Sequence, residues 1–159
     1  MVPTAPQRYG AYMLDTTEFN AVAKGELPLS AIAGRRLFVT HVQLDEINKA
    51  PCERMRAQLR AAFEDIAAEN LPTESIVLGV SRLGQGKFPA ADSDFAAMRK
   101  MLEALDKATA KRRLNQACDI LIAETAIRNK LTLVSGDPNL RKVTIEFGGH
   151  AIDRKKFMR

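Results

Sequence analysis

Four acidic residues of this sequence stand at the end of an apolar run or inside one: Asp15, Glu46, Asp119 and Asp137. The first and the last each follow a run of β-forming residues, at the point where a buried strand would end. The two in the middle lie among apolar residues that recur at helical spacing. A charge without a partner is costly to bury in such surroundings. These positions therefore need an explanation, either structural or chemical.

Each acid taken alone has a structural explanation. Asp15 precedes Thr16 and could cap a helix, and Asp137 precedes a proline and could form a turn. Glu46 could be an exposed helix residue, and Asp119 could lie in the first turn of a helix, where the dipole favours an acid.

Taken together, the four acids indicate a cation site. If the sheet is parallel, Asp15 and Asp137 emerge at the same carboxyl edge, and the helices that carry Glu46 and Asp119 pass near that edge. Four converging carboxylates would repel one another strongly. A hard divalent cation with oxygen ligands, Mg²⁺ or Mn²⁺, would relieve that repulsion. Such a centre can orient a water and neutralise a phosphodiester.

The elements that must position these acids alternate along the chain. We predict strands at 12–14, 37–40, 76–80, 131–135 and 151–152. Between and after them we predict helices that follow Asp15, begin near Val42, and span 52–68, 94–108, 115–129 and 139–146. Alternating strands and helices predict an α/β fold, with a central parallel sheet of about four to five strands flanked by helices on both faces.

Length and composition favour one domain without a membrane span. The chain has 159 residues, of which 46% are hydrophobic and 27% are charged. The N-terminus lacks the pattern of a secretion signal, so we expect a cytoplasmic protein. We expect Cys52 and Cys118 to be small buried hydrophobes rather than a metal pair.

The net charge of +5 favours polyanionic partners. Among the basic clusters, Lys111, Arg112 and Arg113 lie shortly before Asp119. A helix from about Asn115 would hold them at the rim of the acidic site, where they could bind substrate phosphates. The alternative is a solvated linker between two helices.

Four sequence blocks carry a resemblance to a known family. "MLDTTEFN", "FVTHVQLDEI", "NQACDILIAETAI" and "LTLVSGDPNL" resemble, in order, the signature blocks of the PIN-domain nucleases, and they span Met13 to Leu140. They match in hydroxyl residues as well as in acids: Thr16 follows the first acid, Thr40 lies six residues before the glutamate, and Ser135 lies two before the last acid.

The resemblance implies metal-dependent hydrolysis of RNA that leaves a 5′-phosphate and a 3′-hydroxyl. Carried over by position, Asp15, Glu46, Asp119 and Asp137 would be the catalytic and metal-binding acids, with Mg²⁺ or Mn²⁺ as cofactor. Thr16 and Ser135 would support them by hydrogen bonding. We accordingly divide the chain into an N-terminal extension at 1–10, a PIN-like nuclease domain at 11–153 and a basic tail at 154–159.

At this size the chain is most similar to the VapC-type toxins of toxin–antitoxin pairs. That similarity implies RNA as substrate and an antitoxin protein as partner, and we also expect a homodimer. Two other classes stay open. One is a PIN-like module that binds RNA or a protein without cutting, and the other is a metal-dependent phosphohydrolase of small substrates.

Overall fold

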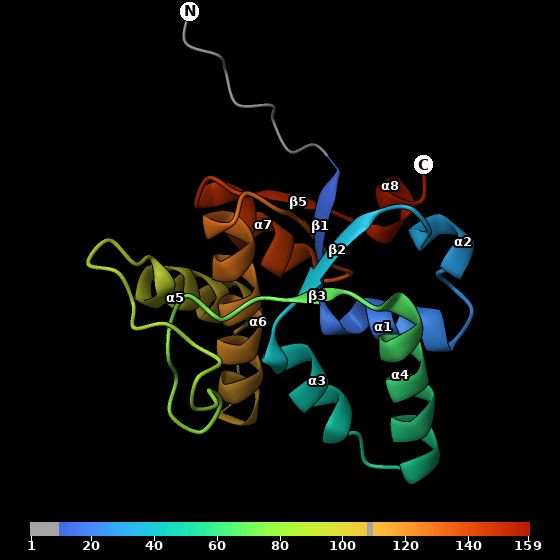
Figure 1. Ribbon diagram of the computed structural model, residues 1–159. Helices are drawn as coiled ribbons and strands as arrows, with labels where there is room; N and C mark the ends of the chain where they lie inside the picture. Colours follow the sequence, from blue (N-terminus) through green and yellow to red (C-terminus); the bar gives the residue numbers. More distant parts are fainter. Residues whose placement is uncertain (1–9, 108–109) are drawn as a thin grey trace, which may run out of the picture.

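The centre of the protein is a sheet of five parallel strands (Figure 1). The computed structural model describes residues 10–107 and 110–159, without the side chains of 110–113. The strands are β1 (Ala11–Leu14), β2 (Arg36–Val39), β3 (Glu69–Asn70), β4 (Thr132–Val134) and β5 (His150–Ile152). Their order in the sheet is β3-β2-β1-β4-β5, and every neighbouring pair is parallel. The predicted α/β fold with a parallel sheet is confirmed.

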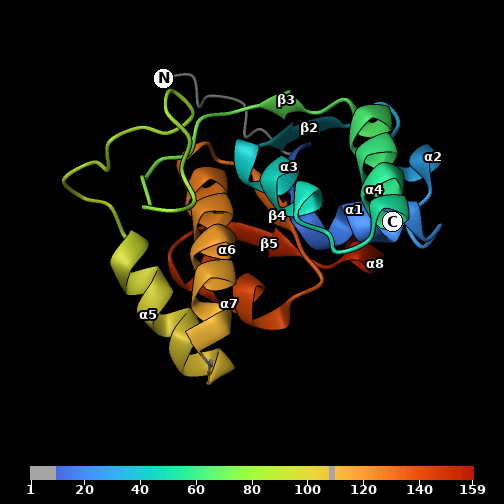
Figure 2. The same cartoon turned by 90° about the horizontal axis from the view of Figure 1, so that it is seen from below.

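Helices cover both faces of this sheet. They are α1 (Thr16–Ala23), α2 (Leu29–Ile32), α3 (His41–Asn48), α4 (Glu53–Ile66), α5 (Phe95–Asp106), α6 (Ala110–Arg128), α7 (Pro138–Glu146) and α8 (Arg154–Phe157). Figure 1 shows α5, α6 and α7 on one side of the sheet and α1, α2, α4 and α8 on the other. Helix α3 contacts both α4 and α6, and the view from below shows it between these two helices (Figure 2).

Alternation along the strands divides the core into two clusters, one on each face. Met13 and Leu133 pack with Ile120 of α6 on the first face, whereas Leu14 and Val134 pack with Phe19 of α1 on the second. Successive side chains of a strand point to opposite faces, and both faces of a parallel sheet are buried. The three central strands, β2, β1 and β4, are therefore mostly apolar, whereas the edge strand β3 is polar and exposed.

The chain reverses its direction of travel across the sheet between β1 and β4. It moves from β1 outward through β2 to β3, and then returns to place β4 and β5 on the other side of β1. The helices that leave β1 and β4 therefore turn to opposite faces of the sheet (Figure 1). In open α/β sheets this switch point is where ligands bind.

The predicted strand at 76–80 was wrong. Residues 78–80 form turns, Gly79 has φ +83°, and the Leu78 side chain is fully exposed. The edge of the sheet is occupied instead by Glu69 and Asn70 of β3, which pair with β2 directly after α4. Residues 76–80 have β-forming types but pair with no strand of the sheet.

Helix α6 begins at Ala110, earlier than the predicted start near Asn115. The basic residues 111–113 thus lie on the helix backbone and do not form a linker, and their side chains lie outside the described residues. The cysteine prediction was correct for Cys118, which is buried, but wrong for Cys52, which is exposed at the start of α4.

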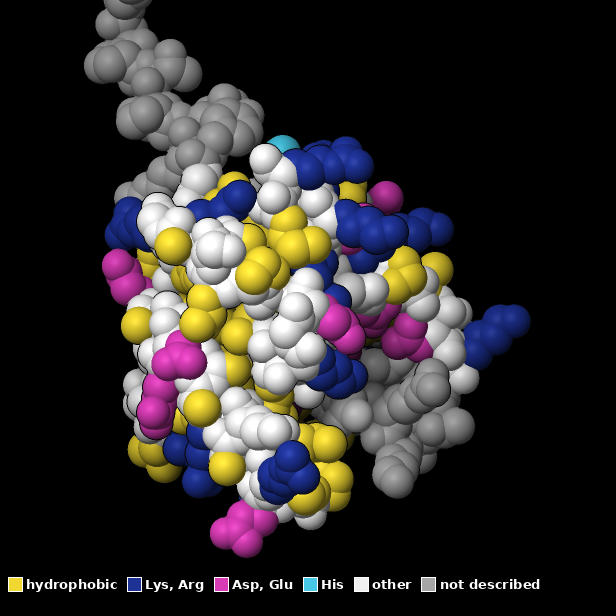
Figure 3. All heavy atoms as spheres, turned by 90° about the vertical axis from the view of Figure 1, so that its right-hand side faces the viewer, with side chains coloured by type: hydrophobic (Ala, Val, Ile, Leu, Met, Phe, Trp, Pro, Cys, Tyr) yellow, Lys and Arg dark blue, Asp and Glu magenta, His cyan; other side chains and the backbone are white. Residues whose placement is uncertain are grey.

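The chain ends are described in part. Residues 1–9 of the predicted extension lie outside the described residues. Within the predicted basic tail, α8 places Phe157 in the second core cluster. The described helices include none with the length and apolar character needed to cross a bilayer. On the face shown in Figure 3, acidic side chains gather beside Lys and Arg side chains, so charges of both signs share this surface.

Candidate active site

Asp15 lies at the carboxyl end of β1 and also caps α1. Its Oδ1 accepts a hydrogen bond from the backbone N–H of Thr16 at 2.8 Å. Its Oδ2 accepts from the hydroxyl groups of Thr17 at 2.9 Å and Ser135 at 2.8 Å. Although these donors favour the charged form, burial outweighs them and raises the pKa of Asp15. The capping interpretation is therefore correct, and it leaves a buried carboxylate at the switch point.

Asp137 occupies the equivalent position at the end of β4. Its Oδ1 accepts from the backbone N–H of Asn139 at 2.8 Å, so this acid caps α7. The buried Ser135 links the two acids, because its hydroxyl donates to Asp15 and accepts from the N–H of Asp137 at 3.1 Å. The sequence Ser-Gly-Asp thus ends the strand, caps a helix and connects Asp137 to Asp15.

The helix that carries Glu46 is fixed to the end of β1 by a buried capping box. Thr40 caps α3, and its N–H and hydroxyl both donate to Oε1 of Gln43, at 2.9 and 2.7 Å. The amide nitrogen of Gln43 then donates to the carbonyl of Leu14 at 3.0 Å. Because Leu14 precedes Asp15, this contact sets the position of α3 relative to the first acid.

Glu46 reaches the segment that carries Asp15 from α3. Its Oε2 accepts a hydrogen bond from the hydroxyl of Thr16. Burial is the largest influence on this carboxyl, and the charge of Asp15 adds to it, so that the pKa of Glu46 rises to about 7. Lys49 acts in the opposite direction and does not offset the burial.

Asp119 lies in the middle of α6 and faces the other acids. Its side chain is only partly exposed, and burial is the largest cause that raises its pKa well above the ordinary value. The further causes are the negative charges of Asp15, Glu46, Asp137 and Asp106, in that order. Because α6 begins at Ala110, Asp119 does not lie in its first turn, and the helix dipole does not explain this acid.

The structure therefore brings all four predicted acids to one edge of the sheet, and it adds Asp106 from the end of α5. The metal ligands that these side chains offer are all carboxylate oxygens, the ligand type that Mg²⁺ and Mn²⁺ prefer. Among the described residues, however, no group of three or more His, Cys, Asp or Glu side chains could hold a metal ion as they are now arranged. Their oxygens are engaged in other contacts: the hydroxyls of Thr17 and Ser135 donate to Asp15, and the hydroxyl of Thr16 donates to Glu46.

Sequence reasoning missed three residues that shape this site. Thr17 donates to Asp15, Gln43 fixes α3, and Asp106 lies close enough to Asp119 to affect its pKa. The T-x-x-Q spacing of the capping box could have identified Gln43. Asp106 gave no local signal, because its contacts are with residues distant in the sequence.

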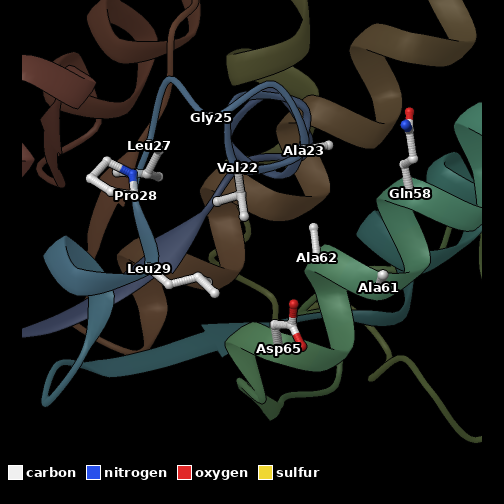
Figure 4. A pocket seen from close by; sticks show the side chains of 10 residues that line it. All are labelled: Val22, Ala23, Gly25, Leu27, Pro28, Leu29, Gln58, Ala61, Ala62 and Asp65. Carbon is white, nitrogen blue, oxygen red and sulfur yellow. The ribbon is translucent and has the colours of Figure 1, made fainter.

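A cavity elsewhere on the molecule contains none of these acids. It has a volume of about 460 Å³ and lies between α1, α4 and the connection to α2 (Figure 4). Asp65 is its one charged lining residue, and the rest are mostly small or apolar side chains. It is separate from the switch point.

Comparison with known proteins gives structural likenesses only. No family model matches the chain, and no curated protein matches it. VapBC-5 of Mycobacterium tuberculosis, from a family of toxin–antitoxin systems, is 23% identical with a TM-score of 0.46, covering 91% of this chain and 97% of that chain. VapBC2 of Rickettsia felis, solved with a promoter DNA fragment, is 14% identical with a TM-score of 0.44, covering 90% and 98%.

FitAcB of Neisseria gonorrhoeae is 16% identical with a TM-score of 0.37, and the match covers 89% of this chain and 96% of that chain. The fold described above rests on the strand pairing of this chain, and the function proposed below rests on its side chains.

Proposed function

We propose that this protein is a Mg²⁺- or Mn²⁺-dependent endoribonuclease of the PIN-domain type. One observation carries the proposal: the chain gathers carboxylates at the switch point, where Thr16 and Ser135 link three of them and their charges all act on Asp119. A fold gains nothing from gathering buried negative charge without a counter-charge. Perturbed acids at a switch point are therefore better explained as a cation site than as structural residues.

In this proposal Asp15, Glu46, Asp119 and Asp137 hold the cation. When bound there, the cation would neutralise charge on the phosphodiester and favour ionisation of an attacking water. The chain itself supplies orientation. The hydroxyl of Ser135 donates to Asp15 and accepts from the backbone N–H of Asp137, so it holds the two strand-end segments next to each other.

The hydroxyl groups of Thr16, Thr17 and Ser135 stabilise the acids while no cation is bound. Thr17 and Ser135 donate to the buried carboxylate of Asp15, and Thr16 donates to that of Glu46, which lowers the cost of burying these groups. These donors must rearrange or share their acceptors when a cation binds. We therefore expect cation binding to be coupled to small side-chain movements within the site.

A partner is a further part of the proposal. The four sequence blocks resemble those of VapC-type toxins, and this likeness supports the assignment of the chain as the toxin of a toxin–antitoxin pair. We accordingly propose that it is located in the cytoplasm and that an antitoxin protein binds it. Lys111, Arg112 and Arg113 remain proposed contacts for RNA phosphates.

The alternative function, a module that binds RNA or protein without cutting it, has one observation in its favour. The carboxylates of the described residues are not arranged to hold a cation as they stand. A module of this kind would bind RNA with the same affinity in the presence of Mn²⁺ or of a chelator.

Cleavage of a defined single-stranded RNA separates the two functions. The purified chain is incubated with the RNA in Mg²⁺, in Mn²⁺ and in EDTA, and the product ends are identified by mass. We expect cleavage with either cation and none in EDTA, with 5′-phosphate and 3′-hydroxyl ends.

Two variants make this test specific. Asp15→Asn should abolish cleavage while its melting temperature stays equal or rises, because the change removes like-charge repulsion. Asp65→Asn, an exposed acid on α4, is the matched control and should cut like the wild type. Cleavage that persists in EDTA, or in Asp15→Asn, would contradict the proposed function.

A further inference from the structure

Gln116 is a buried polar residue that the four acids do not explain. It lies on α6 three residues before Asp119, and positions three apart share a face of a helix. Its side chain is 2% exposed. Its Oε1 has no hydrogen-bond partner among the residues that the structure describes. Burying an amide oxygen without a hydrogen-bond donor destabilises a fold, so the burial of this atom needs an explanation.

The other end of the same amide is held by Asp106. Gln116 donates from Nε2 to Oδ2 of Asp106 at 2.9 Å. The second oxygen of Asp106, Oδ1, accepts from Nδ2 of Asn139 at 2.7 Å. One carboxylate therefore joins the end of α5 to α6 and to the start of α7, next to the segments that carry Asp119 and Asp137.

This clamp fixes which way the amide of Gln116 points. A carboxylate oxygen only accepts, so Gln116 must present its NH₂ group to Asp106. Its carbonyl oxygen is then turned away from Asp106. Asn139, which donates its side-chain amide to Asp106, also donates its backbone N–H to Asp137, and this shared residue places the clamp beside the acidic site.

We infer that Gln116 supplies a further oxygen donor to the acidic cation site, and that Asp106 is the positioning residue that keeps this oxygen turned toward it. The inference rests on the proposed function. An amide oxygen is an accepted ligand of hard divalent cations and equally an acceptor for their bound waters. The cation or its water would satisfy the atom that the described residues leave without a donor.

The competing explanation is a core glutamine whose oxygen is satisfied by a buried water. Buried waters commonly bridge such atoms. In that case Gln116 would affect the stability of the fold and would have no influence on cation affinity. The two explanations therefore differ in a binding measurement, which needs no catalytic activity.

The test is the affinity of the free protein for Mn²⁺, measured by calorimetry with no RNA present. Gln116→Met keeps the length of the side chain and removes both polar ends. We expect its Mn²⁺ affinity to fall by roughly 10- to 100-fold, the usual loss when a supporting group of a metal site is removed. Gln58→Met, an exposed glutamine on α4, is the matched control and should bind like the wild type. Melting temperatures without Mn²⁺ verify that each variant is folded.

The role of Asp106 is tested by a double-variant cycle. The side chain introduced by Asp106→Asn has an NH₂ group of its own, so the amide of Gln116 can turn over and present NH₂ to the cation. This variant should also lose Mn²⁺ affinity. Because Asp106 acts through Gln116, combining Asp106→Asn with Gln116→Met should lose no more than Gln116→Met alone. Additive losses would overturn the positioning role.

The remaining outcomes separate this inference from the proposed function. If the wild type binds Mn²⁺ and Gln116→Met binds it equally, the further inference is wrong and the nuclease proposal stands. If the wild type does not bind Mn²⁺, the proposed function itself fails, and Gln116 has no cation to serve.

Discussion

The charge of Glu46 depends on pH near neutrality. Its pKa rises from the ordinary 4.5 to about 7, mainly through burial. The folded protein therefore holds a proton that the unfolded chain has released between those two values. The contribution of Glu46 to the free energy of unfolding is therefore greatest below pH 4.5, and it falls as the pH rises toward 7.

Glu46→Gln should remove this loss of stability. The expected gain in the free energy of unfolding, measured by urea denaturation in EDTA, is about 3 kcal/mol at pH 8 and about 1 kcal/mol at pH 5. The glutamine oxygen can still accept from Thr16, so the local hydrogen bond is kept. Glu64→Gln, an exposed acid on α4, should give no gain at either pH. An equal gain at both pH values would show that ionisation of Glu46 is not the cause.

At this scale the sequence predicted the acids and two of the hydroxyl residues that donate to them, Thr16 and Ser135, but not Asp106 or Gln116. Asp15 and Asp137 could be found because each follows a strand, and the parallel sheet then brings them together. Asp106 and Gln116 could not be found, because their contact joins the end of α5 to α6 across a break between the two helices. No periodicity reports a hydrogen bond between two different helices.

At the scale of elements, α8 is attached to the helix that Asp15 caps. Arg154 donates from Nε to Oε2 of the fully buried Glu18 at 2.8 Å, and from Nη1 to Glu26 at 2.9 Å. Glu18 lies in the first turn of α1, two residues after Thr16. The C-terminal helix therefore supports the segment that positions the first acid.

Arg154→Met should destabilise the fold by about 3 kcal/mol, because it leaves the Glu18 carboxylate buried without its counter-charge. Lys155→Met, an exposed neighbour on α8, should change the free energy of unfolding by less than about 0.5 kcal/mol. Urea denaturation measures both. Adding Glu18→Gln to Arg154→Met should restore much of the loss, and a double variant that is no more stable would rule out the charge as the cause.

Most elements followed from periodicity, and the exceptions have physical reasons. The β-forming run at 76–80 pairs with no strand of the sheet. The polar pair Glu69–Asn70 forms β3 instead, because the chain passes β2 as it leaves α4. Propensity says which residues suit a strand, and the tertiary path decides whether a partner strand is present. The start of α6 was missed because the sequence at 110–114 lacks an apolar pattern of helical spacing.

At the scale of the whole molecule, the net charge of +5 should attract RNA. If Lys111, Arg112 and Arg113 contact phosphates, their triple alanine variant should flatten the salt dependence of RNA binding by roughly 1 per lost contact in log–log slope. The variant Lys155→Ala/Lys156→Ala/Arg159→Ala removes the same charge from the exposed C-terminal end and should leave the slope nearly unchanged. Equal slopes for the two variants would show that Lys111, Arg112 and Arg113 do not contact RNA phosphates.

The central claim is that the acids at the switch point form a divalent-cation site. Calorimetric titration of the free wild-type protein with Mn²⁺, at about pH 6 and about pH 8 in buffers of different ionisation enthalpy, tests it most directly. Raised pKa values leave Glu46 and Asp119 holding protons that a cation must displace. We therefore expect Mn²⁺ to bind with release of protons at the lower pH, and to bind more tightly with less release at the higher pH. Absence of binding at both pH values, or an affinity that does not change with pH, would contradict the account.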